Sequence, residues 1–319
     1  MKILVTGGAG FIGSHLCEEL LKAGNSVTAL DNLSTGRDDN ISHLKGNRSF
    51  KLVKGDVLQE KLVSRLVKAA DEVYHLAASV GVELVVRQPL ESLNTNIKGS
   101  QILLNYACDH RKKILMVSTS EIYGKNTHGP LKEDDDRILG SPLKTRWGYS
   151  TAKAVDEMLA YVYFKKRGLP TLIVRLFNTV GPRQTGAYGM VIPRFVQQAL
   201  AGEPLTVYGT GKQTRCFLHV KDAVWAMIKL MSEPAAIGDV FNVGSQEEIS
   251  IEDLAKRVIQ DTHSKSEIKY IPYDQAYEEG FEDMQRRIPD ITKISRLIGF
   301  KPTASLDQII QEVVAYFSR

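Results

Sequence analysis

Cysteine is scarce in this chain, and long apolar runs and strongly charged segments are missing. The 319 residues include three cysteines, Cys17, Cys108 and Cys216, which lie far apart without a CxxC pair. This argues against a disulfide framework or a metal site and favours a reducing cytoplasm. No stretch reaches the ~18 apolar residues of a membrane span. The first residues enter a strand and a glycine turn at once, which does not fit a signal peptide.

The charge balance is mild. Lysine and arginine total 41 and aspartate and glutamate 37, a net charge of +4. Such a balance gives no reason to expect a nucleic-acid partner, but it is compatible with an anionic small molecule. Apolar residues make up 43% and charged residues 24%, as in ordinary globular enzymes, and the length allows two domains.

Short apolar runs alternate with helical stretches through the first half of the chain. We expect helices near 13–23, 60–68, 94–110 and 150–167. The expected strands lie at 3–5, 26–30, 50–53, 72–76, 114–117 and 172–176. This alternation predicts an α/β fold, a Rossmann doubly wound parallel sheet with helices on both faces.

Glycine and proline become frequent after Asn178, which indicates a change of organisation. We therefore predict a Rossmann domain over 1–177, which also receives 215–245. The remainder of 178–319 is expected to form a smaller α/β lobe that binds the substrate. Helical apolar spacing recurs at 251–259 and 306–317.

A glycine-rich segment follows the first expected strand and opens the first helix. Residues 7–13 read G-x-x-G-x-x-G, which lets backbone N–H groups approach a pyrophosphate. Asp31 ends the second strand, where a carboxylate accepts hydrogen bonds from ribose hydroxyls and repels a 2′-phosphate. The pattern therefore predicts NAD rather than NADP. Asp56, after the third strand, is either an adenine contact or a turn residue.

The expected cofactor contacts are backbone and side-chain groups at the ends of successive strands. They are Gly7, Gly10, Phe11, Ile12, Gly13, Asp31, Asn32, Asp56, Val57, Leu76, Ala77, Ala78, Tyr149 and Lys153.

Tyr149 and Lys153 form a Y-x-x-x-K pair on one face of an expected helix. An ammonium beside a phenol favours the phenolate, so Tyr149 is a candidate general base near neutral pH.

These motifs together resemble the extended short-chain dehydrogenase/reductase family, in particular its NAD-dependent nucleotide-sugar epimerases, dehydratases and decarboxylases. The resemblance covers essentially the whole chain. Its further marks are His75-Leu76-Ala77-Ala78, Ser118–Gly124, Arg175-Leu176-Phe177-Asn178, Gly181-Pro182-Arg183, Leu205–Gly209 and Gln213-Thr214-Arg215.

The resemblance implies a retained NAD that oxidises the sugar at C4 and later returns the hydride. It makes Tyr149 the base for the C4 hydroxyl, Lys153 the nicotinamide-ribose ligand that lowers the tyrosine pKa, and Thr119 the hydroxyl bonded to O4. It places further residues at nucleotide-diphosphate positions: Asn178, Val191, Leu205, Tyr208, Arg215 and Arg287.

Glu121 is the residue that bears on the reaction. In the resembling UDP-glucuronate decarboxylases and 4,6-dehydratases a glutamate commonly stands there, and in 4-epimerases a smaller residue. We therefore expect UDP-glucuronate decarboxylation, with UDP-sugar 4-epimerisation as the alternative and a non-catalytic NAD-binding regulator as a remote one. A carboxylate near the sugar acid needs a cation beside it, and Arg183 and Arg215 are the candidates.

Relatives pair through two helices of each subunit, so the resemblance implies a homodimer. The expected apolar stripe contains Ile102, Leu103, Tyr106, Met158 and Val162.

Overall fold

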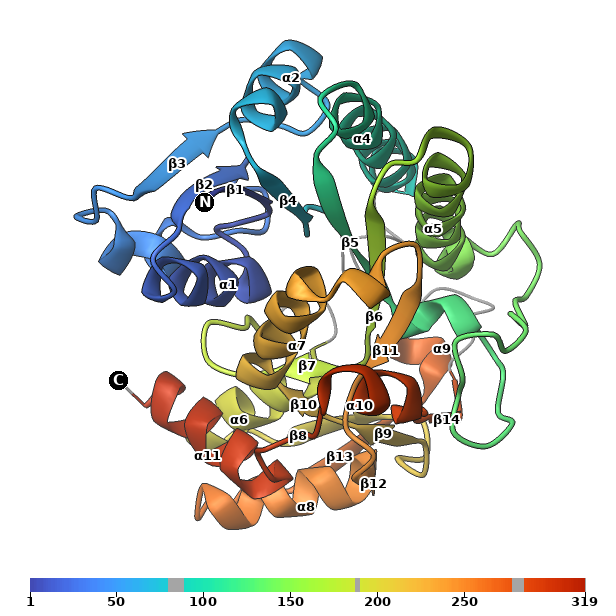
Figure 1. Cartoon of the computed structure of the whole chain (residues 1–319). Coiled ribbons are helices and arrows are strands. Elements are labelled where there is room, and N and C mark those ends of the chain that lie inside the picture. Colours follow the sequence, from blue (N-terminus) through green and yellow to red (C-terminus); the bar gives the residue numbers. More distant parts are fainter. Residues whose placement is uncertain (80–88, 187–189, 277–283, 319) are drawn as a thin grey trace.

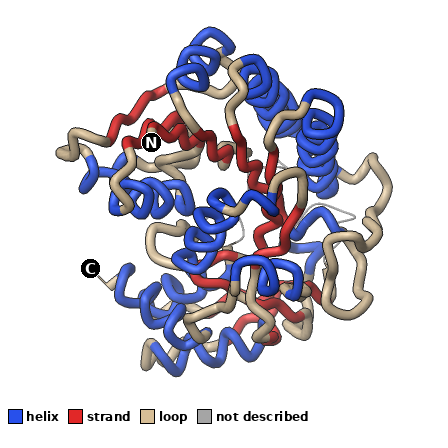
Figure 2. Tube along the Cα trace, in the orientation of Figure 1, coloured by secondary structure: helices blue, strands red, loops and turns tan. Residues whose placement is uncertain are grey.

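A computed structural model describes residues 1–79, 89–186, 190–276 and 284–318. Its centre is a parallel seven-stranded sheet with the order β11-β6-β5-β4-β1-β2-β3 (Figures 1 and 2). The strands are β1 Lys2–Thr6, β2 Ser26–Asp31, β3 Phe50–Lys54, β4 Glu72–His75, β5 Lys113–Thr119, β6 Thr171–Leu176 and β11 Val240–Val243. The predicted doubly wound Rossmann sheet is confirmed, and its order reverses beside β1.

Helices cover both faces of the sheet, which explains why the inner strands are mostly apolar and buried, whereas the edge strand β3 is only partly buried. One face packs against α1 Phe11–Lys22, α7 Val220–Ser232 and α10 Thr292–Ile298. The other packs against α2 Glu60–Ala69, α4 Pro89–Asp109 and α5 Gly148–Arg167. The helix α4 begins at Pro89, earlier than predicted, because proline is well tolerated in a first helical turn.

A second group of elements surrounds a separate apolar core below the sheet in Figure 1. It comprises α6 Val191–Ala201, α8 Ile251–Asp261, α11 Leu306–Phe317 and the parallel pair β8 Leu205–Tyr208 and β13 Ile268–Ile271. Ser250 and Ser305 cap α8 and α11 with their side chains, and Gln308 completes a capping box.

Short elements connect these two parts. The strands are β7 Thr179–Val180, β9 Thr214–Cys216, β10 Leu218–His219, β12 Glu248–Ser250 and β14 Arg286–Arg287, with the helical turn α9 Tyr273–Ala276. The 3-10 turns are η1 Asp38–Leu44, η2 Ser120–Tyr123, η3 Thr145–Trp147 and η4 Pro234–Ala236. After β10 the chain returns through α7 to the edge of the large sheet at β11. Over the described ranges, no helix is long and apolar enough to cross a membrane.

His75 lies buried at the end of β4. Its Nδ1 is 2.7 Å from Thr6 Oγ1 and its Nε2 is 3.1 Å from Ser100 Oγ. Burial, with the nearby Lys153 charge, lowers the His75 pKa to about 3. The imidazole is therefore neutral in the folded protein, where it joins β1, β4 and α4.

This histidine should make the fold sensitive to mild acid. The folded pKa lies below the unfolded value of about 6.5, so only the unfolded chain binds the proton between pH ~6.5 and ~3. The free energy of unfolding should fall as pH decreases through this window, with up to about 1.4 kcal/mol per pH unit from this group. Urea unfolding of His75→Gln between pH 7 and 5 should show a shallower dependence. The exposed His128 supplies the control variant His128→Gln, and equal slopes for His75→Gln and the wild type would contradict the assignment.

Candidate active site

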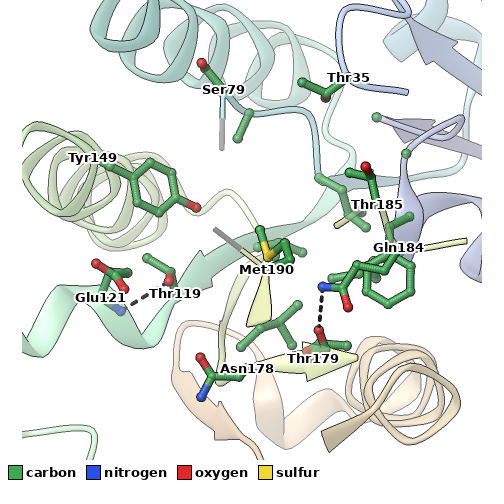
Figure 3. Close-up of a pocket in the computed structure, with 18 of the residues that line it drawn as sticks. Thr35, Ser79, Thr119, Glu121, Tyr149, Asn178, Thr179, Gln184, Thr185 and Met190 are labelled. Carbon is green, nitrogen blue, oxygen red and sulfur yellow. Dashed lines mark hydrogen bonds between the residues drawn. The ribbon is translucent and has the colours of Figure 1, made fainter. Parts of the chain in front are cut away.

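A cavity of about 840 Å³ opens at the carboxyl ends of the central strands. This is where ligands bind in doubly wound sheets. Both parts of the molecule line it, from the glycine turn after β1 to Arg287 on β14. In Figure 3, Tyr149, Thr119 and Glu121 lie together on one side, Gln184 and Thr185 lie on the other, and Met190 lies between them.

The glycine turn forms a close-fitting backbone surface at the start of α1. Gly7 has a φ of 74°, and a Cβ there would lie 2.8 Å from the Ala77 nitrogen. A Cβ on Gly13 would lie 2.0 Å from the Gly7 oxygen. The first turn of α1 carries no acidic residue and faces the cavity, so its N–H groups and dipole favour an anion.

Asp31 braces this turn and borders the cavity. Its Oδ2 accepts a hydrogen bond from the Ala9 N–H at 2.9 Å, and its Oδ1 accepts one from the Leu33 N–H at 2.8 Å. Each carboxylate oxygen retains a second lone pair for a ribose hydroxyl. The glycine cradle and this carboxylate together fit the pyrophosphate and ribose of NAD.

Most of the predicted cofactor residues border the cavity. Those that line it are Gly7, Gly10, Phe11, Ile12, Gly13, Asp31, Asn32, Val57, Leu76, Ala77, Ala78 and Tyr149. Asp56 lies behind this lining, where it accepts a 2.7 Å hydrogen bond from Asn32 Nδ2 and one from the Leu58 N–H. Its observed partners are those of a turn residue.

Tyr149 and Thr119 meet at the floor of the cavity. Thr119 ends β5 and caps η2, and its Oγ1 accepts a hydrogen bond from the Glu121 N–H at 3.2 Å (Figure 3). Burial raises the pKa of Tyr149, and the Glu121 and Asp156 carboxylates raise it further, while hydrogen bonding with Thr119 lowers it. The phenol is therefore held protonated next to a fixed hydroxyl.

Lys153 lies one turn from Tyr149 on α5 but does not reach the cavity surface. Its Nζ is 2.8 Å from Asp156 Oδ2, and both side chains are almost fully buried. The sequence led us to expect that Lys153 lowers the pKa of Tyr149. In the structure the pKa of Tyr149 is raised, first by burial and then by the Glu121 and Asp156 carboxylates, so the lowering by Lys153 stays a prediction.

Glu121 lies between two buried guanidinium groups. Its Oε2 is 2.6 Å from Arg146 Nη2, and its Oε1 pairs with Arg287 Nη1. Arg287 also donates a 2.7 Å hydrogen bond to Asn178 Oδ1. The two arginines lower the pKa of Glu121 to about 2 against the opposing effect of burial. Glu121 is an anion throughout the neutral range, with more positive than negative charge around it.

The predicted cation partners of Glu121 were wrong. Arg183 pairs with Glu18 at 2.7 Å, on the glycine-turn side of the cavity. Arg215 lies on β9 and donates to the carbonyl of Thr214. Arg146 was missed as a partner, although it stands just before Tyr149 in the sequence. Backbone pairing of β14 with β9, which the sequence does not reveal, brings in Arg287.

Five of the six predicted substrate residues line the cavity. They are Asn178, Val191, Tyr208, Arg215 and Arg287. The prediction that Leu205 contacts the substrate was wrong, because its fully buried side chain packs in the core between α6, α8 and α11. Strand alternation explains this, since Leu205 and Val207 face the core and Tyr208 faces the cavity.

The sequence analysis missed several polar lining residues. They include Ser34, Thr35, Arg37, Asn40, Ser79, Gln184, Thr185, Gln213 and Tyr273. Some follow recognised motifs, Thr35 after Asp31 and Gln184 after Gly181-Pro182-Arg183, so position offered a signal. Tyr273 offered none. Among the described residues no group of three or more His, Cys, Asp or Glu side chains is arranged for a metal ion.

Known proteins of similar sequence align with this chain over the residues that form the site. Residues 4–313 match the family model described as GDP-mannose 4,6 dehydratase. The UDP-N-acetyl-alpha-D-glucosaminuronate decarboxylase of Bacillus cytotoxicus is 43% identical over 317 residues, which cover 99% of this chain and 97% of the relative. UDP-glucuronic acid decarboxylase 1 of Danio rerio is 37% identical, over 100% of this chain and 73% of the relative.

A solved structure of UDP-glucuronic acid 4-epimerase from Bacillus cereus, in complex with UDP-glucuronic acid and NAD, has a TM-score of 0.89 and 32% identity. It aligns over 100% of this chain and 99% of its own. The family model and these relatives span the glycine turn, the Tyr149 helix and the arginine-flanked carboxylate. The chain therefore belongs to the GDP-mannose 4,6-dehydratase family, within the extended short-chain dehydrogenase/reductase enzymes that act as nucleotide-sugar epimerases, dehydratases and decarboxylases.

Proposed function

We propose that this enzyme is an NAD-dependent decarboxylase of a UDP-hexuronate, with UDP-glucuronate as the preferred candidate. The observation that carries the proposal is the Glu121 carboxylate held between Arg146 and Arg287 at the cavity wall. The decarboxylase relatives support it, and their two substrates differ in the group at sugar C2. UDP-N-acetylglucosaminuronate is therefore the second candidate substrate.

NAD held by the glycine turn and Asp31 would supply the hydride acceptor and donor for sugar C4. Once ionised in the assembled complex, Tyr149 takes the proton of the C4 hydroxyl, and the Thr119 hydroxyl holds that oxygen in place. A ketone at C4 makes the sugar acid a β-keto acid, so the C5–C6 bond can break with release of carbon dioxide. Its electron pair is delocalised toward O4, and a proton added at C5 gives the UDP-4-keto-pentose. Once C4 is reduced again, Tyr149 would return its proton to O4, which gives the UDP-pentose.

The charges around Glu121 favour a carboxylate at C6. Two guanidinium groups and one carboxylate leave one net positive charge at this wall of the cavity. A substrate carboxylate would complete the balance, whereas a hydroxymethyl group would leave a guanidinium charge without an added counter-charge. Arginine suits this role because it stays charged and its planar fork binds carboxylates.

Glu121 itself is suited to positioning rather than to proton donation. With a pKa of about 2 it carries no proton to give at neutral pH. Its carboxylate fixes both arginines, one from each part of the molecule, on either side of the sugar site. The Glu121→Gln variant should therefore retain NAD binding but lose the ordered pair of cations.

The test follows products by NMR with UDP-glucuronate, UDP-N-acetylglucosaminuronate and UDP-glucose supplied separately. The wild type should release carbon dioxide from a hexuronate and form a UDP-pentose or its 4-keto form. Glu121→Gln should lower the rate by ~10²-fold or more, the usual effect of losing a preorganised electrostatic group. Tyr149→Phe should lower it by ~10²–10⁴-fold.

A matched control lies next to the site. Arg286, adjacent to Arg287, pairs with Glu248 at the surface, and Glu248→Gln should change turnover less than twofold. Formation of UDP-galacturonate from UDP-glucuronate without carbon dioxide would replace the decarboxylase proposal with the 4-epimerase. If the sugar does not react although NAD is bound, both enzyme proposals fail and the non-catalytic NAD-binding regulator is the remaining alternative.

Asp31 should determine the cofactor. A 2′-phosphate would bring two anions into contact at a position where backbone N–H groups already fix the carboxylate. Calorimetry on protein stripped of nucleotide should give an affinity for NAD at least ~10-fold above that for NADP. Asp31→Asn should narrow this difference, and equal affinities in the wild type would refute the assignment.

We also propose that the enzyme is a homodimer that pairs through α4 and α5, which lie side by side in Figure 1. Met158, Tyr161 and Val162 are 66%, 51% and 51% exposed on α5. The predicted stripe needs one correction, because Leu103 is fully buried against the sheet of its own chain, and Ile102 and Tyr106 pack partly on the same core. The exposed residues of α5 therefore supply most of the apolar surface proposed for the dimer contact.

Light scattering at micromolar concentration should report a dimer for the wild type. Met158→Glu should shift the mass toward the monomer, since it places a charge in the centre of the apolar face. Leu143, 90% exposed in the loop before η3, supplies the matched control, and Leu143→Glu should leave the mass unchanged. A wild-type monomer would refute this arrangement.

A further inference from the structure

Helix α5 carries a buried carboxylate that the reaction chemistry above does not use. Asp156 stands three residues after Lys153 and seven after Tyr149, so the three side chains share one helical face. The Asp156 and Lys153 side chains are 2% and 3% exposed, with Oδ2 and Nζ 2.8 Å apart. Asp156 Oδ1 makes no hydrogen bond to any described residue.

A buried ion pair of this kind is costly to form, so its presence in the fold needs a physical explanation. Removing two charges from water costs several kcal/mol per ion, and the pair recovers this only with good geometry and further hydrogen bonds. Here one carboxylate oxygen lacks a described partner, so the pair is poorly satisfied for a purely structural contact. The pair shares the face of α5 that carries Tyr149, and the Asp156 charge acts on the phenol.

Among the described titratable groups near Lys153, Asp156 is the one that pairs with its ammonium. His75 on β4 lies near the ammonium but is neutral, because burial and Lys153 itself hold its pKa near 3. Glu121 on η2 is engaged by Arg146 from η3 and Arg287 from β14.

The next carboxylate on the helix, Glu157, accepts hydrogen bonds from Arg175, from Nε at 2.9 and 3.3 Å and from Nη2 at 2.8 Å.

We propose that Asp156 is a positioning residue for the oxidation step, which holds the Lys153 ammonium beneath Tyr149 and offsets its charge. The proposal rests on the proposed function for its kinetic readout. Lys153 has three N–H donors, so one bond to Asp156 leaves two N–H groups for other acceptors. The same bond orders the Lys153 side chain before the cofactor binds, so less conformational entropy is lost on binding.

The offset contributes to the acidity of the phenol. Burial raises the pKa of Tyr149 most, and the Glu121 and Asp156 carboxylates raise it further. Removing the Asp156 charge uncovers the ammonium and lowers the phenol pKa. In a reaction that needs the phenolate, the acid limb of the pH profile should therefore move to lower pH.

The first test is the pH profile of kcat/KM for the holoenzyme with the hexuronate substrate. In Asp156→Asn the acid limb should shift down by about half a pH unit or more. Asp156→Glu, which restores the charge, should move it back toward the wild-type position. If the amide prevents folding, Asp156→Ser leaves room for a water beside Lys153 and carries the same expectation.

Glu157→Gln is the matched control. It removes the neighbouring buried carboxylate on the same helix, so it should lower stability by breaking the pair with Arg175 and leave the acid limb in place. A folded Asp156→Asn enzyme with the wild-type limb would overturn the proposal. So would an Asp156→Asn variant that behaves like Glu157→Gln, with lower stability and an unmoved limb.

A second readout does not depend on turnover. Tyrosinate absorbance is titrated in the full chain, and the difference between Asp156→Asn and Asp156→Asn/Tyr149→Phe isolates Tyr149. Phenolate should form at lower pH than in the corresponding wild-type pair. If the wild type proves inactive on every hexuronate, the proposed function fails while this titration still decides the role of Asp156. An unchanged titration rejects that role even in an active enzyme.

Discussion

The site depends on one constraint, that a carboxylate removed from water must be paired. Glu121 is nearly enclosed, and it remains ionised only because Arg146 and Arg287 contact its two oxygens. These three residues come from η2, η3 and β14, which are far apart in the sequence. The pairing therefore joins the sheet with the part of the chain that follows it, and it fixes the wall of the cavity. Loss of the carboxylate would leave two buried guanidinium groups facing each other, so this wall cannot relax independently of its neighbours.

The two halves of the cavity recognise their ligands by different physical means. Around the glycine turn, backbone N–H groups, a helix N-terminus and a single braced carboxylate face the cavity. Around Glu121 the recognition is by side-chain charge, supported by the Arg287 hydrogen bond to Asn178. Backbone recognition tolerates little substitution, because a Cβ on Gly7 or Gly13 would collide with main-chain atoms. Side-chain recognition can change with one residue, which fits a family whose members share a cofactor site and differ in reaction.

The fold and the cofactor half could be predicted from the sequence because their signals are local. Strand and helix periodicity predicted the sheet, and the glycine turn with Asp31 marked the crevice beside β1. The substrate half depends on pairing between distant segments, so Arg183 and Arg215 were wrongly expected beside Glu121. Leu205 was misplaced for a smaller reason, since a one-residue change of position in a strand exchanges core and cavity. A shared helical face predicted that Tyr149 and Lys153 are neighbours. It did not predict that Asp156 pairs with the Lys153 ammonium and offsets the effect of that charge on the phenol.

That last point affects how the Y-x-x-x-K pattern is interpreted. The pattern is usually taken to mean a lysine that acidifies a tyrosine, which requires the ammonium charge to be uncompensated. Here the ammonium has a carboxylate at 2.8 Å, and a second carboxylate, Glu121, also acts on the same phenol. Burial and both carboxylates favour the protonated tyrosine, so the resting site holds its base in the neutral form. Hydrogen bonding with Thr119 acts in the opposite direction. Deprotonation must therefore be coupled to ligands that bring positive charge near Tyr149, which would confine proton removal to the fully assembled complex.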